Sequence, residues 1–270
     1  PGDCANIARE AAQTGQELRI YACGGDGTLN EVVTGMVGFP NAAVTVFAGG
    51  SGNDFIRMFD NPEAFTDLNQ LLDAREEQLD LIRVNDDYAF NICSVGLDAR
   101  IGTDVSGYKR IPMFHGFRAY LVSTLVNVIR GIGEHYNIEI NGRRMDGEYT
   151  MVCVCNGQFY GGGFHPVPEA DPRDGKLEVL LVEKVSRLKV PGIIAKYKAG
   201  RYRELPDIVQ HFTTDRLTIR CDNDTAINLD GELRRAKVIN ISVAEEKIRF
   251  FYPASTRLVV KKTAPEAATV

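Results

Sequence analysis

Two glycine-rich bends, each placed between a short apolar run and a helical pattern, constrain the fold of this chain more than any other feature. The first bend is GGDGT, residues 24–28, and it follows LRIYAC. The second is GGSGND, residues 49–54; it follows AAVTVFA and precedes the helical pattern PEAFTDLNQLLDAR. This alternation predicts parallel strands joined by helical crossovers. Because bends after neighbouring parallel strands line one crevice, we expect them to share a ligand site.

The composition of the bends favours phosphate as that ligand. Glycines let main-chain N–H groups approach an anion, and a following helix N-terminus adds partial positive charge. The dinucleotide fingerprint fails because Asn30 stands where it needs glycine, and no P-loop motif occurs. Asp26 would repel phosphate directly, so a Mg²⁺ ion or its water between them is favoured, with Asp54 sharing that role. The alternative is two ordinary glycine turns with helix-capping side chains.

Beyond about residue 80 the pattern changes to a series of short strands. LDLIRVND, YNIEINGRRM, KLEVLLVEKV and KIRFFYP are examples, and Asn141-Gly142 marks a reversal of direction. Helical patterns interrupt the series at 116–132 and 188–200. The second part is therefore predicted to be mostly antiparallel and to form a β-sandwich.

The change of pattern divides the chain. We predict a nucleotide-binding α/β domain over residues 1–82, joined by a tail at 254–270 that packs back on it, and a β-sandwich over 83–253. The chain opens with a helical pattern, although a Rossmann-like half normally opens with a strand. We therefore expect an upstream strand and loop to be absent from these residues.

Composition excludes several classes of protein. The chain has 270 residues and a formal net charge of −5, which argues against a nucleic-acid-binding face. No apolar run approaches the ~18 residues of a membrane span, and the start PGDCANIARE lacks the features of a signal peptide. The six cysteines are scattered without a CxxC pair, so we expect no zinc cage and a reducing, cytoplasmic location.

The bends also carry a family resemblance. GGDGTLNEVVTG followed by GSGNDFIR resembles the diacylglycerol kinase catalytic domain, which bacterial lipid kinases share with sphingosine and ceramide kinases. NICSVGLDARI, NGQFYGGGFHPVPEADPRDGKLEVLLVEK and INLDGELRR are similar to later motifs of that family. The resemblance implies an NAD-kinase-like α/β domain and a β-sandwich, with the substrates meeting in the cleft between them. It also implies that the family's first strand and phosphate-contacting loop precede Pro1.

The resemblance implies an ATP-dependent lipid kinase that transfers the γ-phosphoryl group to a lipid hydroxyl, with diacylglycerol to phosphatidic acid as the favoured reaction. Two alternatives stay open: an NAD-kinase-like phosphotransferase with a soluble acceptor, and a non-catalytic regulator that responds to nucleotide or lipid. Ser51 stands where the family usually has threonine, and it keeps the hydroxyl. The implied nucleotide-binding residues are Gly24, Gly25, Asp26, Gly27, Thr28, Leu29, Asn30, Ser51, Gly52, Asn53 and Asp54.

The segment NLDGELRR places two carboxylates, Asp230 and Glu232, around a glycine. If the segment is extended, both point to one face. The resemblance places the general base here; we favour Glu232 as the base, with Asp230 orienting it or helping to hold magnesium, and Asp26 is the rival base. The alternative is a plain Asp-Gly hairpin turn.

A second acidic segment, EADPRDGKLEV, precedes a strand. The resemblance implies a structural Mg²⁺ here, held by the Asp174 side chain and the carbonyls of Asp171 and Lys176; the alternative is a solvated acidic turn. An apolar stretch with cations, residues 108–121, could guide an acyl chain or simply cover the sandwich. As partners we expect a lipid alcohol at a membrane surface reached by peripheral association, no nucleic acid and no membrane-spanning segment; a homodimer stays open.

Overall fold

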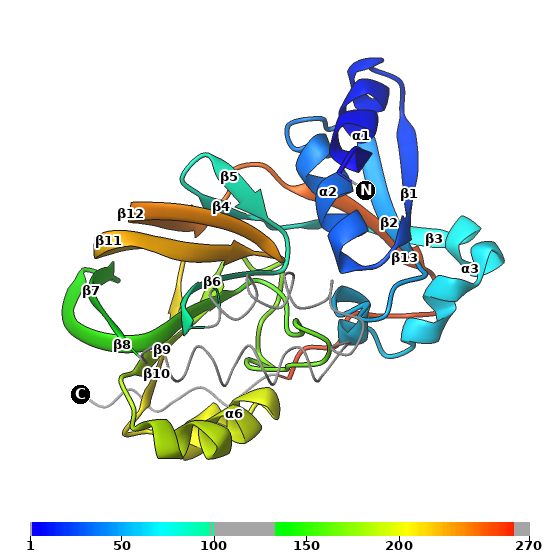
Figure 1. The fold of residues 1–270 in the computed structure, drawn as a ribbon. Coiled ribbons are helices and arrows are strands. Elements are labelled where there is room, and N and C mark those ends of the chain that lie inside the picture. The colour runs from blue at the N-terminus through cyan, green and yellow to red at the C-terminus, as the bar shows by residue number, and fades with distance from the viewer. Residues whose placement is uncertain (1, 98, 100–132, 262–270) are drawn as a thin grey trace, which may run out of the picture.

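The computed structural model describes residues 2–97, 99 and 133–261, which form two units side by side (Figure 1). The first unit contains a four-stranded sheet in the order β1-β2-β13-β3. Strands β1 and β2 are parallel and in register from Leu18↔Ala42 to Gly24↔Ala48, as the alternating pattern predicted. Strand β13 is parallel to β2, and β3 is antiparallel to β13. The bounds are α1 (Cys4–Gln13), β1 (Leu18–Gly24), α2 (Asp26–Met36), β2 (Ala42–Ala48), β3 (Ala74–Leu79) and β13 (Ile248–Pro253).

Strand β13 corrects part of the sequence interpretation, which placed the segment KIRFFYP in the sandwich. The strand instead lies between β2 and β3 in the first sheet. Its Phe250 is fully buried and packs against Phe55, Phe59 and Phe65, with ring centroids 5.1, 6.2 and 6.5 Å away. This aromatic cluster explains why the strand belongs to the first unit.

The helix expected over PEAFTDLNQLLDAR is shorter and broken. It consists of the 3₁₀ helix η2 (Pro62–Thr66) and the single-turn α3 (Leu68–Leu72). Asp67 interrupts it, because its extended backbone ends η2 and its side chain caps α3 by accepting the Asn69 N–H. The last residues of the expected helix open strand β3, which pairs with β13.

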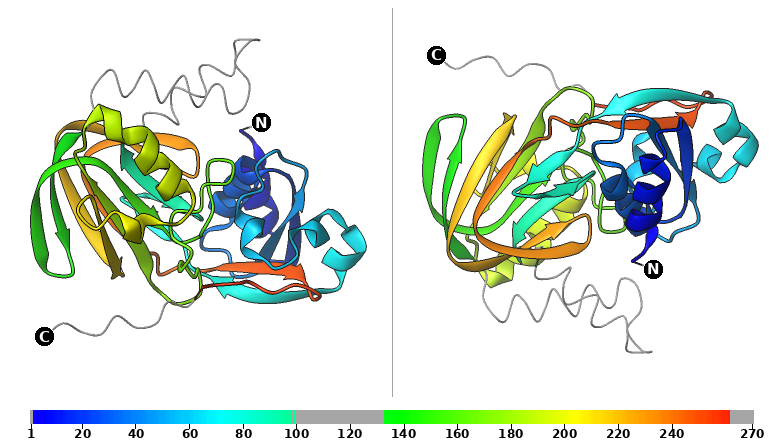
Figure 2. Two further views of the ribbon diagram at one scale, coloured as in Figure 1. Left: turned by 90° about the horizontal axis from the view of Figure 1, so that it is seen from below. Right: turned by 90° about the horizontal axis from the view of Figure 1, so that it is seen from above.

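The second unit contains a nine-stranded sheet in the order β10-β9-β8-β6-β11-β12-β4-β5, and β7 pairs with both β8 and β11. The sheet therefore closes around a buried apolar cluster, and the β-sandwich-like fold predicted for this part of the chain is confirmed (Figure 2). The bounds are β4 (Ile82–Val84), β5 (Asp87–Ala89), β6 (Ile92–Gly96), β7 (Glu134–Ile140), β8 (Arg143–Cys155), β9 (Leu177–Glu183), β10 (Val209–Thr214), β11 (Arg216–Leu229) and β12 (Glu232–Val243).

Short helices complete the two units. The helix expected at 188–200 is confirmed as α6 (Val190–Lys198), preceded by the 3₁₀ turn η3 (Arg187–Lys189). The others are η1 (Phe55–Met58) and η4 (Tyr202–Glu204). The helix expected at 116–132 and the apolar stretch at 108–121 lie outside the described residues. No helix in the described part of the chain is long and apolar enough to cross a membrane.

The tail after Pro253 returns to the first unit, as the sequence predicted. Leu258 is buried and forms an isolated bridge with Phe59, and the Val259 N–H donates to the Met58 carbonyl at 2.8 Å. The Gln158 side chain of the second unit donates to the Val259 carbonyl at 2.8 Å. The tail therefore ties both units together beside the bend that follows β2.

Candidate active site

The two glycine-rich bends lie against each other at the carboxyl edge of the first sheet. The Gly49 and Gly50 N–H groups donate to the Gly24 carbonyl at 3.0 and 3.1 Å, which extends the β1–β2 pairing into the bends. Asp26 Oδ1 accepts the Asp54 N–H at 2.6 Å and the Phe55 N–H at 3.3 Å. The expectation that the two bends share one place is therefore confirmed.

Contact between the bends accounts for three of their six glycines, namely Gly25, Gly50 and Gly52. A Cβ on Gly50 would lie 2.3 Å from the Gly25 Cα, and one on Gly52 would lie 2.6 Å from Asp26 Oδ2. A Cβ on Gly24 would lie 2.3 Å from Thr28 Oγ1. At Gly27, by contrast, a Cβ would meet nothing within 4 Å. Half of the glycines therefore make room for the neighbouring bend, Gly24 makes room for Thr28 of its own bend, and the space beside Gly27 is open to a ligand.

The two asparagines of the bends have different surroundings. Asn53 has a positive φ of 50° and closes its own bend, because its side chain accepts the Gly50 N–H and donates to the Gly50 carbonyl. Asn30 is buried, and its Oδ1 has no hydrogen-bond partner among the described residues. Ser51 is exposed, whereas Leu29 is buried in the core of the first unit.

A cavity lies where the first unit faces the second. Its volume is about 50 Å³. The first unit contributes Asp26, Leu29, Asn30, Asp54 and Phe55 to its lining, and the second contributes Phe90, Asn91, Tyr160 and Asp230. Three carboxylates from distant parts of the chain therefore meet in one cleft.

Sequence reasoning missed four residues of this cleft, namely Phe55, Phe90, Asn91 and Tyr160. A signal was present for three of them, and Phe55 lies in the motif GSGNDFIR. Asn91 opens the segment NICSVGLDARI, and Tyr160 lies in NGQFYGGGF, both of which carry the family resemblance. The side chain of Asn91 donates to the Phe159 carbonyl at 2.5 Å, which holds these two segments together.

Asp230 and Glu232 do not share one extended face, so that expectation is wrong. Leu229 pairs with Glu232, and Asp230 and Gly231 have φ values of 49° and 102°, which makes them a two-residue hairpin turn. Asp230 is partly buried, and its carboxylate accepts the Phe90 and Ile92 N–H groups at 2.6 and 2.7 Å and the Asn91 N–H at 3.0 Å. The turn therefore holds the start of β6 against the cleft.

Glu232, in contrast, points to solvent beside the cleft. Its side chain is 61% exposed, and its nearest cation is Arg234 at 3.9 Å. Unlike Asp26 and Asp230, it accepts no backbone N–H from the part of the chain that the structure describes. It does not line the cavity.

The electrostatics of the cleft concentrate negative charge. Burial raises the pKa of Asp230 to about 6, against the opposing effect of its three N–H donors, and the charge of Asp26 raises it further. Burial also raises the pKa of Asp54, with the charge of Asp26 adding to the effect. The Gly162 N–H, donated to Asp54 Oδ2 at 2.6 Å, and Arg57 oppose that rise. The negative charge of Asp26 therefore disfavours the ionised form of both neighbouring carboxylates.

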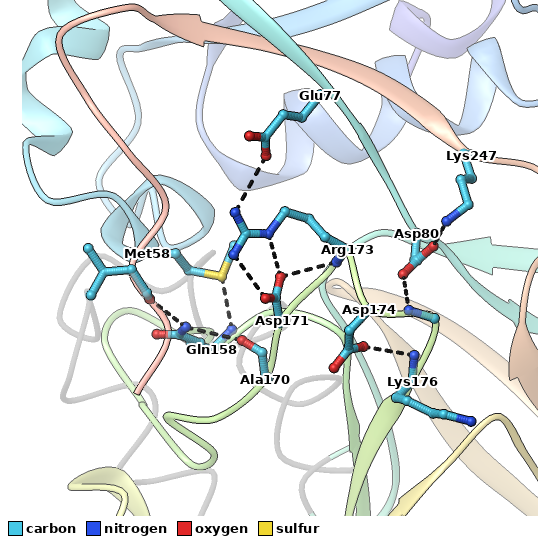
Figure 3. A network of polar contacts seen from close by, with 12 residues as sticks. Met58, Glu77, Asp80, Gln158, Ala170, Asp171, Arg173, Asp174, Lys176 and Lys247 are labelled. Atoms are coloured by element: carbon cyan, nitrogen blue, oxygen red, sulfur yellow. Dashed lines mark hydrogen bonds and ion pairs between the residues drawn. The ribbon is translucent and has the colours of Figure 1, made fainter. Parts of the chain in front are cut away.

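The second acidic segment does not line this cavity, and its carboxylates belong to a separate set of polar contacts (Figure 3). The Asp171 carboxylate is held by Arg173 at 2.6 and 2.9 Å, whereas Asp174 Oδ1 accepts the Lys176 N–H at 2.8 Å and no other donor from the residues that the structure describes. Burial raises the pKa of Asp174. Buried Asp80, paired with Lys247, accepts the neighbouring Gly175 N–H. Among the described residues, no group of three or more His, Cys, Asp or Glu side chains is placed to hold a metal.

An α/β unit with paired glycine bends, facing a β-sandwich across an acidic cleft, is the architecture of NAD-kinase-like proteins. The family model described as "YegS C-terminal NAD kinase beta sandwich-like domain" matches residues 91–252, and the "Diacylglycerol kinase catalytic domain" model matches residues 1–84. The chain therefore belongs to the family of the YegS C-terminal NAD kinase beta sandwich-like domain, and its first 84 residues match the diacylglycerol kinase catalytic domain that the motifs predicted.

Individual relatives agree with this assignment. A Staphylococcus carnosus protein named "Putative lipid kinase" is 24% identical over 256 residues, which cover 93% of this chain and 83% of that protein. A Staphylococcus epidermidis protein with the same name is 26% identical over 249 residues, covering 91% of this chain and 80% of its own length. A solved structure titled as a "putative diacylglycerol kinase" from Bacillus anthracis shares the fold, with a TM-score of 0.72, 20% identity and coverage of 96% and 84%.

Proposed function

We propose that the protein is an ATP-dependent lipid kinase that transfers the γ-phosphoryl group of ATP to a lipid hydroxyl, with diacylglycerol as the favoured acceptor. The observation that carries this proposal is the cavity in which Asp26, Asp54 and Asp230 meet beside the joined bends. The names of the relatives support a lipid kinase at the level of the family.

The nucleotide is proposed to bind along the bends. Gly27 lies in the first turn of α2, where the helix N-terminus favours phosphate and the space beside its Cα is open. Asp26 and Asp54 are proposed to hold Mg²⁺ through water, since the cavity of about 50 Å³ has room for a few water molecules. The ion would neutralise charge on the transferring phosphoryl group.

The general base is proposed to be Glu232. A base must be within reach of the substrate hydroxyl and must have an oxygen free for its proton. The Asp230 carboxylate accepts three N–H groups and Asp26 Oδ1 accepts two, whereas Glu232 accepts none from the described residues. Asp230 is proposed to fix the turn from which Glu232 reaches the acceptor, and Asp26 remains the rival base.

A second cavity supports a lipid acceptor. It lies between α6 and strands β8 and β9, and Tyr160 lines both this cavity and the acidic one. Apart from a threonine and the phenol groups of its tyrosines, its lining is apolar: Leu97, Thr150, Met151, Tyr160, Phe164, Val182, Val185, Val190, Ile193, Ile194 and Tyr197. We propose that it receives an acyl chain whose alcohol end faces the acids.

Other proposals rest on the family resemblance together with local geometry. Asp174 offers an exposed carboxylate whose Oδ1 accepts the Lys176 N–H, and with the carbonyls of Asp171 and Lys176 it is proposed to hold a Mg²⁺ ion that shapes the loop. Peripheral association with a membrane from the cytoplasmic side follows from a lipid acceptor. The homodimer remains a prediction.

The test is transfer of label from [γ-³²P]ATP to a panel of diacylglycerol, sphingosine, ceramide and a prenol, followed by extraction into organic solvent. Label in the diacylglycerol product supports the proposal. Label that stays in an aqueous acceptor would favour the NAD-kinase-like alternative, and ATP binding without transfer would favour a regulator. We expect Glu232→Ala to abolish transfer while the control Glu139→Ala, an exposed residue of β7, retains it.

A further inference from the structure

The η3 turn (Arg187–Lys189), between β9 and α6, presents an unusual surface. Residues 186–189 are all exposed, and the Leu188 side chain is 92% exposed, more than any other large apolar side chain in the described part of the chain. A singly exposed leucine is ordinary on a protein surface. Leu188 differs because a cation stands on each side of it.

Those two cations are not neutralised locally. Arg187 and Lys189 form no ion pair in the part of the chain that the structure describes. Nearby lysines are paired: Lys184 lies 2.7 Å from Glu148, and Lys196 lies 3.3 Å from Glu204. The turn therefore combines an exposed apolar tip with two free positive charges, in a chain whose formal net charge is −5.

The turn also lies at the apolar cavity. Val185, just before the turn, and Val190, just after it, both line that cavity. Tyr160 lines the same cavity and the acidic cleft. A lipid entering beside η3 would therefore reach the cleft through an apolar lining.

We propose that the η3 turn docks the protein on an anionic bilayer, with Leu188 inserted among the acyl chains and Arg187 and Lys189 at the phosphate groups. An exposed apolar side chain flanked by cations suits the interface between headgroups and acyl chains. This inference rests on the proposed lipid acceptor. Docking on a bilayer would assist turnover only if the substrate lies in that bilayer.

The experiment measures co-sedimentation with vesicles of phosphatidylcholine alone or mixed with phosphatidylglycerol. The variants are Leu188→Asp and the double variant Arg187→Gln/Lys189→Gln. Matched controls are Leu72→Asp, on α3 at the far end of the molecule from α6 (Figure 1), where the leucine is 60% exposed, and Arg216→Gln on β11. Each variant is also assayed on short-chain diacylglycerol in detergent micelles and in vesicles.

We expect the wild type and both controls to bind the phosphatidylglycerol vesicles. Each cation should contribute roughly fivefold to the affinity for anionic vesicles, so the loss of both should weaken binding about 25-fold. Both η3 variants should keep wild-type turnover in micelles and lose it in vesicles. Equal vesicle binding by η3 variants and controls would overturn the proposal, and so would a wild type that binds no vesicle. Vesicle binding that depends on η3 without turnover in micelles would instead overturn the proposed function and leave the docking surface standing.

Discussion

The contact between the two bends makes Gly50→Ala a sharp test of the site's construction. The new Cβ would lie 2.3 Å from the Gly25 Cα, whereas ordinary van der Waals contact begins at 3.4 Å. The bends must therefore separate by about 1 Å, because the Gly25 Cα and N atoms in the way belong to backbone that cannot change rotamer, and the Asn53 side chain, 2.8 Å away, must shift as well. Gly49→Ala is the matched control, because its nearest neighbours would lie 4.0 Å away.

Overpacking of a well-packed site costs about 1–3 kcal/mol. Because the backbone itself must move, we expect Gly50→Ala to lower the free energy of unfolding by about 2–3 kcal/mol. That loss corresponds to a fall in Tm of roughly 5–10 °C for a chain of this size. The same separation would pull the Asp54 N–H away from Asp26 Oδ1, so kinase turnover should fall as well.

Urea unfolding followed by far-UV circular dichroism measures the first effect, and labelled ATP transfer measures the second. Gly49→Ala should stay within about 0.5 kcal/mol of the wild type. Equal stability of the two variants would show that the bends do not press on each other as described. Our account of the glycines would then be wrong.

Three further predictions concern single residues. Gly27→Ala should raise the free energy of unfolding by about 0.5–1 kcal/mol, because alanine has the higher helix propensity. The new methyl group would occupy the open space beside Gly27, so ATP affinity measured by calorimetry should fall more than tenfold. An unchanged affinity would mean that the nucleotide binds elsewhere. Glu31→Ala removes the acceptor of the Gly2 and Cys4 N–H groups at the start of α1. The free energy of unfolding, measured in urea, should fall by about 1 kcal/mol, and kcat should be unchanged. A loss of kcat would give Glu31 a catalytic role. Burial lowers the pKa of His165 below its ordinary value of 6.5, and the charge of Lys261 lowers it further. Because the folded protein favours the neutral ring, the free energy of unfolding falls as the pH drops below 6.5. His165→Phe, which keeps an aromatic ring against Phe159, should therefore lessen the drop in urea midpoint between pH 7.5 and 5.5, and an identical drop would contradict this.

The local features of this chain were predictable because they depend on near neighbours in sequence. The glycine bends, the parallel β1–β2 pair and α6 all follow from apolar periodicity and turn residues. The two-residue turn at Asp230-Gly231 had an equally strong local signal, since Asp-Gly between strands is a hairpin marker. We nevertheless expected two carboxylates on one face of an extended segment, although the Asp-Gly dipeptide was the stronger indication and predicted a hairpin turn.

The remaining features depend on contacts between distant segments. Whether a glycine makes room for a ligand or for another part of the chain is decided by its neighbour, and for Gly50 that neighbour is Gly25. The choice of sheet for β13 is decided by the aromatic cluster around Phe250. Asn91 and Tyr160 reach the cleft only through the fold of the sandwich. Apolar periodicity and turn residues do not contain this information; for Asn91 and Tyr160 the signal in the sequence was the family resemblance of their segments.

The position of β13 has a consequence for how the protein is made. During synthesis β1, β2 and β3 leave the ribosome long before Ile248–Pro253, yet β13 must lie between β2 and β3. Until then the facing edges of β2 and β3 are unpaired, and the apolar site that Phe250 fills is empty. Both features promote association with other nascent chains. A fragment that stops before this strand would lack an inner strand of the first sheet, so the first unit is completed only after the sandwich has been translated.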